Sequence, residues 1–245
     1  MTKLDPAFVA RPIAHRGRHG GDLVENSTGA FAAAIAQGFG IELDVQASRD
    51  GVPMVFHDDR LDRLTEASGP TCDALARDLK NLRLKGSVET IPTLEEVLEQ
   101  VAGQVPLLVE IKDQDGKLGR NTGGLTKAVG ALLEQYNGPL AAMSFNPHHV
   151  EGLACARGLV TCAFNPHNWP GVPSDRLAGL AGILDADAVG ASFVSHDWRD
   201  LGRPRVAALK DQGLDVLCWT IRSAKDEQKA RQLAQNITFE GYDPG

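Results

Sequence analysis

The chain has 245 residues, of which 42% are apolar, 23% charged and 5% aromatic, so it can bury a sizeable core as one α/β barrel or as two small domains. Its net charge of −7 at pH 7 argues against a general binder of nucleic acid or anionic membranes, because both need a basic face. A small anionic substrate is compatible with this charge, since such a molecule responds to the local groups of a site.

The first quarter of the chain predicts two strands and a hairpin. Residues 12–17 read as a strand, and a glycine-rich loop leads to Asn26 and Ser27, either of which can cap a helix that ends near Gly38. Residues 40–46 form the next strand. Only a short turn separates that strand from 52–56, and a parallel neighbour needs a connection of a dozen or more residues. We therefore expect 52–56 to be an antiparallel partner or a loop excursion, outside the barrel.

The rest of the chain alternates regularly after a polar insertion. Residues 59–90 read as this insertion, with a short helical piece near Cys72 to Leu84, and Thr93 opens a capping box with Glu96. We expect strands over 107–111, 141–145, 160–164, 189–194, 216–219 and 237–239, and helices over 125–136, 149–157, 175–184, 204–210 and 223–235.

Eight strand–helix alternations, without a helix after the last strand, favour a closed TIM (β/α)8 barrel with a small insertion after the second strand. An open doubly wound sheet is the alternative, but no G-x-G-x-x-G follows the first strand. We expect a single domain over 1–245, with 59–90 as the small insertion within it.

The four cysteines show no C-x-x-C pairing, which indicates neither a zinc ribbon nor a redox pair. Cys162 and Cys218 lie in apolar runs and are expected to be small core residues. Residues 1–11 hold no apolar run long enough for a signal peptide, and no later stretch approaches transmembrane length. We expect a reduced, soluble, cytoplasmic protein with no stable membrane insertion; its oligomeric state is not indicated.

Three carboxylates are expected at the ends of neighbouring barrel strands. Glu42 and Asp44 are two residues apart and share a face, as do Glu110 and Lys112. An all-carboxylate cluster suits Mg²⁺ or Ca²⁺ better than zinc. The alternative is that these acids pair with Arg16 and Lys112 without any metal, and spacing leaves both interpretations open.

Two histidines also end apolar runs near these carboxylates. We interpret His15 and His57 as an acid/base pair, although a lone histidine is more often a core or surface residue. Arg16 and Lys112 add fixed positive charge suited to phosphate oxygens, unless they serve only as ion-pair partners of nearby acids. His15 belongs to the first strand and His57 to the hairpin, which predicts that His57 is the more mobile of the two.

Ten short runs follow one another in a specific order along the chain. They are His15-Arg16-Gly17, Glu25-Asn26-Ser27 before Ala30-Phe31, Glu42-Leu43-Asp44-Val45, Asp50-Gly51, Val55-Phe56-His57-Asp58, Leu61-Asp62-Arg63-Leu64-Thr65, Ile91-Pro92-Thr93-Leu94-Glu95-Glu96-Val97-Leu98, Glu110-Ile111-Lys112, Ser144-Phe145 and Trp219-Thr220-Ile221. Taken together, these runs resemble the glycerophosphodiester phosphodiesterases over nearly the whole chain. A lone HRG tripeptide would be a weak signal, but the ordered set is highly specific.

The resemblance implies a TIM barrel that hydrolyses glycerophosphodiesters to sn-glycerol 3-phosphate and an alcohol with a divalent cation, Mg²⁺ or Ca²⁺. It also implies that the insertion helps to shape the substrate mouth. By position, His15 and His57 match the general acid and base; Glu42, Asp44 and Glu110 match the metal ligands; Arg16 and Lys112 match the phosphate contacts; Trp219 matches the aromatic residue that packs on glycerol.

The chain departs from the family pattern in two places. Val24 replaces the usual proline of Pro-Glu-Asn-Thr, and Ser27 replaces its threonine. The last strand is usually followed by Thr-Asp-x-Pro, whereas here the run is Phe239-Glu240-Gly241-Tyr242-Asp243-Pro244. That strand end lies at the expected active-site face, so leaving-group preference is the property it puts in question. Loop residues around Trp169 and Trp198 either line the alcohol side or simply cover the loop ends.

The charge of a phosphodiester sets the expected mechanism. The cation and the two basic side chains oppose charge that grows on the phosphate oxygens, while the histidines move protons. The nucleophile is either water or the glycerol 2-hydroxyl, and either histidine can be the base. Two other functions compete: a lysophospholipase D or phospholipase C-like activity on a lipid, and a catalytically silent barrel that acts as a binding module.

Overall fold

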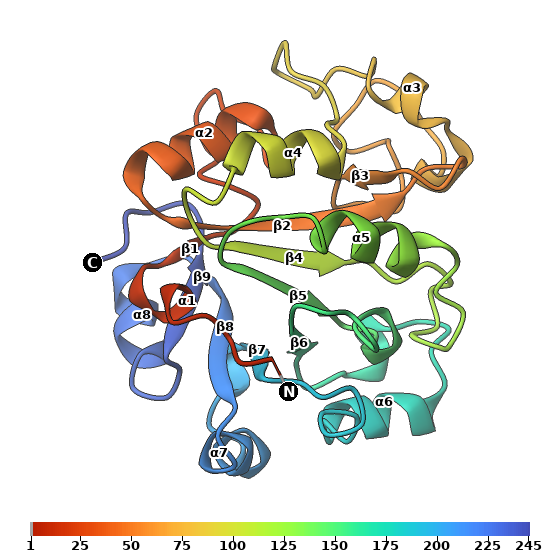
Figure 1. Ribbon diagram of the computed structural model, residues 1–245. Coiled ribbons are helices and arrows are strands. Elements are labelled where there is room, and N and C mark those ends of the chain that lie inside the picture. Colours follow the sequence, from red (N-terminus) through yellow and green to blue (C-terminus); the bar gives the residue numbers. More distant parts are fainter. Residues whose placement is uncertain (1) are drawn as a thin grey trace.

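Eight parallel strands close on themselves in the computed structural model, which describes residues 2–245 (Figure 1). The ring closes because β1 pairs with both β2 and β9. This confirms the predicted TIM barrel. The barrel strands are β1 (Ile13–Ala14), β2 (Gly40–Ala47), β4 (Leu107–Ile111), β5 (Leu140–Ser144), β6 (Ala156–Thr161), β7 (Phe193–Asp197), β8 (Asp215–Ile221) and β9 (Asn236–Phe239).

The helices that connect successive barrel strands lie outside the ring, as expected for right-handed βα crossovers, whereas α1 precedes β1 and α3 lies in the insertion (Figure 1). The α-helices are α1 (Ala7–Ala10), α2 (Thr28–Gln37), α3 (Ala76–Leu79), α4 (Leu94–Val101), α5 (Leu125–Leu133), α6 (Ser174–Ala181), α7 (Pro204–Asp211) and α8 (Ala224–Ala230); single 3-10 turns cover Thr71–Asp73, Pro147–His149, Pro166–Asn168 and Trp198–Asp200. Among residues 2–245, no helix has both the length and the apolar character needed to cross a membrane.

Local sequence explains where the first two long helices begin and end. Ser27 caps α2 by accepting a hydrogen bond from the backbone N–H of Ala30, and Gly38 ends it at φ +68°, a conformation that glycine adopts without strain. Thr93 and Glu96 form the predicted capping box of α4. These helices pack beside each other over β2, and thereby fix the strand that carries two of the predicted carboxylates.

The third strand is the predicted antiparallel excursion. β3 (Pro53–Val55) pairs with the end of β2, and residues 59–90 follow it. This segment, with α3, projects beside β2 (Figure 1). It packs around a small apolar cluster of its own, which includes Phe56, Leu79 and Ile91. Cys72 in this segment is exposed, and Cys218 is buried in the barrel wall, where burial raises the pKa of its thiol to about 12.

The predicted helix over 149–157 is wrong. The connection from β5 to β6 contains only the 3-10 turn Pro147–His149 and an irregular loop. Val150 and Leu153 are buried with helix-like spacing, but Gly152 has φ +81° and interrupts any helix between them. Gly158, the residue after this predicted helix, lies inside β6. A Cβ at this position would fall 2.2 Å from the Phe193 ring, so glycine leaves room for that ring.

The barrel interior changes from apolar to charged along the strands. An apolar cluster fills the inside near the N-terminal ends of the strands and includes Leu108, Phe193 and Leu217. Phe8 of α1 belongs to this cluster and is fully buried, so α1 covers that end of the barrel. Side chains alternate along a strand, so the inward positions after Leu108 are Glu110 and then Lys112. The charged groups therefore gather at the C-terminal ends.

Candidate active site

A cavity of about 180 Å³ opens at the C-terminal ends of the barrel strands. His15 and Arg16 reach it from the end of β1, Glu42 from β2, and His57 from the chain after β3. The structure thus brings together residues up to about 200 positions apart in the chain. The cavity is lined by every predicted site residue except Asp44, namely His15, Arg16, Glu42, His57, Glu110, Lys112 and Trp219.

The three predicted carboxylates form one buried cluster. Glu42, Asp44 and Glu110 each offer an oxygen, and these atoms lie within 4.8 Å of one another. Burial, followed by the charges of Asp44 and Glu110, raises the pKa of Glu42 well above its usual range. Burial also opposes ionisation of Asp44, but Lys112, His57 and Arg16 outweigh it and hold its pKa far below the usual value.

The two predicted basic residues contact this cluster as well as the cavity. Lys112 Nζ lies 2.6 Å from Asp44 Oδ1 and 2.5 Å from Glu110 Oε1. Arg16 Nε lies 3.1 Å from Asp44 Oδ2, and its Nη1 donates to Glu25 Oε1 at 2.6 Å. The ion pairs considered from the sequence are therefore present, and both basic side chains still border the cavity.

The cluster fits a divalent cation. Three carboxylates face two cationic side chains, and Glu42 makes no ion pair with a lysine or arginine among residues 2–245. Glu42 Oε2 accepts the backbone N–H of Arg16 at 2.9 Å, which orients it. Within that same range, Asp44 Oδ1 has no hydrogen-bond partner despite its short approach to Lys112. Buried oxygen ligands with excess negative charge are the donors that Mg²⁺ and Ca²⁺ prefer.

The backbone at the start of the loop after β1 is shaped to reach this cluster. Arg16 has φ +54° and Asn26 has φ +57°, and left-handed conformations of this kind are uncommon outside glycine. The strained turn at Arg16 points its N–H at Glu42, while Asn26 Nδ2 donates to Asp44 Oδ2 at 2.9 Å. The role of Asn26 as a support for the carboxylate cluster was missed in the sequence, where it was read only as a helix cap.

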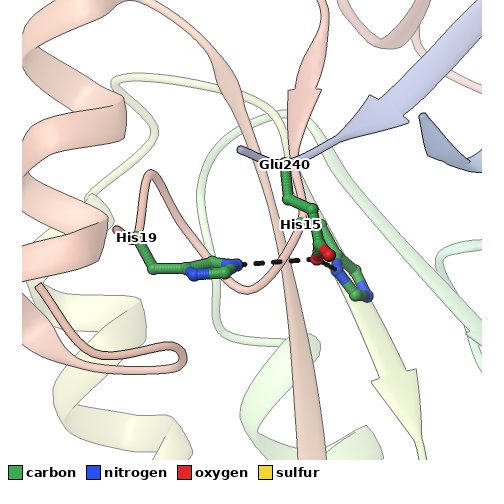
Figure 2. A group of neighbouring side chains, drawn as sticks. All are labelled: His15, His19 and Glu240. Atoms are coloured by element: carbon green, nitrogen blue, oxygen red, sulfur yellow. Dashed lines mark hydrogen bonds and ion pairs between the residues drawn. The ribbon is translucent and has the colours of Figure 1, made fainter. Parts of the chain in front are cut away.

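Each predicted histidine is hydrogen-bonded to a carboxylate through Nδ1. His57 lies 2.7 Å from Asp58 Oδ1, and His15 lies 2.5 Å from Glu240 Oε2 (Figure 2). Burial lowers the pKa of His15, and the contact with Glu240 opposes that shift. His15 has a side-chain exposure of 14% against 32% for His57. The residues Asp58 and Glu240 were not singled out, although both directly follow strand-end positions that the sequence had marked.

Aromatic side chains extend the site beyond the histidines. Trp219 Nε1 donates to the Ser195 carbonyl at 2.9 Å, which fixes the indole in the first cavity, and the Phe145 ring meets it edge-on at 5.6 Å. A second cavity of about 310 Å³ shares His57, Glu110, Lys112 and Phe145 with the first and is bordered by Trp169. Trp198, in contrast, packs against the outer core. Of the two loops around Trp169 and Trp198, only the first therefore borders the site.

The site combines two histidines, basic side chains and a carboxylate cluster. Such a set of groups can bind an anionic ester and transfer protons during its hydrolysis, and it defines the class as a hydrolase. Within that class, residues 15–238 match the model of the glycerophosphoryl diester phosphodiesterase family, and the chain belongs to this family of phosphodiesterase enzymes. YhdW of Bacillus subtilis, named as a glycerophosphodiester phosphodiesterase, is 28% identical over 231 residues, which is 90% of each chain.

Two further relatives agree with this assignment. A glycerophosphodiester phosphodiesterase of Caldanaerobacter subterraneus is 40% identical over 111 residues, or 42% of this chain and 45% of the relative. The structure of an Oleispira antarctica phosphodiesterase in complex with its product sn-glycerol 3-phosphate superposes with a TM-score of 0.75 and 26% identity. That match covers 96% of this chain and 94% of the other.

Proposed function

We propose that the protein hydrolyses glycerophosphodiesters to sn-glycerol 3-phosphate and an alcohol, with a divalent cation, Mg²⁺ or Ca²⁺, and with His15 and His57 as the acid/base pair. The observation that carries this proposal is that one cavity is bordered by both histidines, both basic side chains and two of the three clustered carboxylates. Family membership supports the substrate class, and the product complex of the Oleispira relative supports the glycerol phosphate half of the substrate.

The residues that line both cavities indicate where each part of the substrate binds. His57, Glu110 and Lys112 border both cavities, so we place the phosphate there. The glycerol half then lies in the smaller cavity against Trp219. The leaving alcohol extends into the larger cavity, past Phe145.

The lining of the larger cavity favours a particular kind of alcohol. Phe145 and Trp169 border it, with ring centroids 5.2 Å apart, and so do the carboxylates Asp59 and Asp113. Aromatic faces attract quaternary ammonium groups, and acidic neighbours add to that attraction. We therefore expect cationic alcohols of the choline type to be bound better than neutral ones.

The side chains of this chain then supply charge and proton transfer. The phosphate monoanion gathers more charge in the transition state, and Arg16 and Lys112 are already held beside it by their carboxylate partners. Glu42, Asp44 and Glu110 would hold the cation, which would supply positive charge beside the phosphate oxygens. One histidine accepts the proton of the nucleophile and the other protonates the leaving alcohol, each worth about 10²- to 10⁴-fold in rate. The nucleophile is water, which gives sn-glycerol 3-phosphate directly, or the glycerol 2-hydroxyl, which expels the alcohol and gives a cyclic phosphate that water then opens to glycerol phosphate.

The insertion over 59–90 supports the site from its rim. Arg63 donates to Asp58 at 2.6 Å and to Glu25 at 2.8 Å, and these carboxylates in turn hold His57 and Arg16. The arginine thus joins both halves of the catalytic apparatus. We propose that the insertion shapes the substrate mouth in this way.

The test is release of sn-glycerol 3-phosphate, measured by a coupled dehydrogenase assay with glycerophosphodiesters that carry different alcohols. We expect EDTA to abolish activity and Mg²⁺ or Ca²⁺ to restore it, and His15→Ala or His57→Ala to abolish turnover. His148→Ala is the matched control, because His148 pairs with Glu151 and lines neither of the two cavities. Full activity in chelator would remove the cation from the proposal, and near-wild-type turnover in either histidine variant would remove that histidine.

The same assay decides between the competing functions. A lysophospholipid with an acyl chain replaces the soluble diester in a parallel reaction. Preference for the lipid would favour a lysophospholipase D or phospholipase C-like activity. A catalytically silent barrel would bind the diester in calorimetry without releasing product from any member of the panel.

A further inference from the structure

Glu240, the first residue after β9, lies between two imidazole rings (Figure 2). Its Oε2 is 2.5 Å from His15 Nδ1 and 3.6 Å from His19 Nε2. Its other oxygen, Oε1, accepts a hydrogen bond from Arg222 Nε at 2.6 Å. The backbone N–H of Glu240 donates to the Ile221 carbonyl at 3.0 Å, so the carboxylate is fixed from both the side chain and the main chain.

We propose that Glu240 is a positioning residue for the phosphodiesterase reaction: it holds the proton of neutral His15 on Nδ1 and so turns the Nε2 lone pair toward the catalytic cavity. Nε2 lies on the side of the ring away from Glu240, 4.0 Å from Glu42 Oε2 (Figure 2). A hydrogen bond at one imidazole nitrogen decides which tautomer is present. This inference rests on the proposed function, because it assigns a catalytic purpose to the orientation of His15.

The geometry favours a shared proton over a shared metal ion. His15, His19 and Glu240 have the residue types and spacing of a metal site. However, tetrahedral bonds of about 2.1 Å separate two ligand atoms by about 3.4 Å, whereas His15 Nδ1 and Glu240 Oε2 are 2.5 Å apart. The guanidinium of Arg222 also occupies the second oxygen of Glu240. An ion would therefore have to displace a short hydrogen bond and lie beside a fixed positive charge.

The other histidine, His57, is held in the same way by different residues. His57 Nδ1 contacts Asp58, and Arg63 donates to both oxygens of that carboxylate. In both cases an arginine braces a carboxylate that in turn holds Nδ1 of a catalytic histidine.

Replacing Glu240 by glutamine separates this role from simple packing. The amide keeps the size of the side chain but has only one acceptor oxygen. When the amide oxygen stays at the Oε1 position, where it accepts from Arg222 Nε, the amide NH₂ faces His15 Nδ1 and donates to it. The proton of His15 then moves to Nε2, the wrong nitrogen. We expect Glu240→Gln to lower kcat by about 10²- to 10⁴-fold with KM within a few-fold of wild type, and to be no more active than Glu240→Ala.

Asp243→Asn is the matched control. Asp243 belongs to the same terminal segment and pairs with Arg18, close to His19 in the chain, but it does not contact His15. We expect this variant to keep kcat within two-fold. If it loses as much activity as Glu240→Gln, or if Glu240→Gln keeps most of the activity that Glu240→Ala loses, the segment acts only by packing and the proposal is overturned.

A direct measurement of the tautomer makes the result independent of turnover. Two-dimensional ¹H–¹⁵N spectra of protein labelled at histidine distinguish a protonated Nδ1 from a protonated Nε2. At pH 8 we expect His15 to carry its proton on Nδ1 in the wild type and on Nε2 in Glu240→Gln. A wild-type proton on Nε2 would overturn the inference. Absence of phosphodiesterase activity with the expected spectra would overturn the proposed function and leave the Glu240–His15 pairing in place.

Discussion

Replacing Glu42 by glutamine should raise the stability of the cation-free protein and abolish its response to the cation. Glu42 is 1% exposed, lies in β2 and shares its cluster with Asp44 and Glu110. The glutamine oxygen can still accept the backbone N–H of Arg16, so the local geometry is preserved. What the variant removes is a buried group that can ionise and has no lysine or arginine ion-pair partner among the described residues 2–245.

The size of the effect follows from the distances in the cluster. The cluster oxygens lie within 4.8 Å of one another, and two unit charges at this largest separation repel by about 3.5 kcal/mol at an effective dielectric constant of about 20. Lys112 cancels much of this field because it contacts both neighbouring carboxylates. Uptake of a proton by Glu42 limits the remaining cost. We therefore expect Glu42→Gln to increase the free energy of unfolding by about 1–3 kcal/mol at pH 8 in EDTA.

The pH dependence has a definite sign. The raised pKa means that folded Glu42 keeps a proton which the unfolded chain loses above about pH 4.5. Between that pH and the folded pKa, the native state binds more protons, so the stability of the wild type falls as pH rises. Glutamine does not titrate, and the variant lacks this part of the fall. Its advantage in EDTA should therefore grow from pH 5 toward pH 8.

A bound cation should reverse the order of the two proteins. A ligand present at 100 times its dissociation constant stabilises the native state by about 2.7 kcal/mol, and a 100-fold loss of affinity leaves about 0.4 kcal/mol. Urea unfolding at pH 8, with EDTA or with Mg²⁺ or Ca²⁺, measures both effects. The reasoning is refuted if Glu42→Gln is less stable than wild type in EDTA and gains as much from the cation as wild type does.

Three further predictions test other parts of the site and fold. Burial opposes ionisation of Glu25, but Arg63 and Arg16 outweigh it and lower its pKa to about 2. Ionised Glu25 therefore stabilises the folded state fully above pH 4.5, and this contribution is lost as the pH falls toward 2. In urea unfolding between these limits, Glu25→Gln should remove about 1–2 kcal/mol of the change in the free energy of unfolding with pH. Trp169→Ala should raise KM about 5- to 20-fold for a choline-type diester and less than two-fold for a diester of glycerol, and equal changes would contradict the proposed alcohol cavity. Gly158→Ala should lower the free energy of unfolding by about 1–3 kcal/mol, since its Cβ meets the buried Phe193 ring, and a stability equal to wild type would show that the ring can move.

Much of the site could be predicted because barrel strands impose a simple rule. Side chains two residues apart share a face, and the C-terminal ends of parallel strands meet at one end of the barrel. Those two facts alone bring Glu42, Glu110 and Lys112 into one place. The hairpin that leads to His57 was predicted from the length of the turn after β2, which is too short for a parallel crossover.

The failures come from contacts that periodicity does not encode. Val150 and Leu153 have helical spacing, but the left-handed turn at Gly152 between them makes the segment a loop. Glu240 lies 225 residues from His15, and only closure of β9 against β1 brings the two together. The position of Glu240 at a strand end was visible in the sequence, whereas its partner was not.

The two histidines differ in what fixes them, and this bears on how the site responds to substrate. His15 follows a barrel strand and is tied to Glu240, whose own strand closes the ring. His57 follows the hairpin, and Asp58 is braced by Arg63 from the insertion. A substrate that displaces the insertion would therefore move His57 and leave His15 in place. The greater mobility of His57 stays a prediction, and its physical basis is this difference in support: His57 is supported from the rim of the barrel, whereas His15 is supported by the closed sheet.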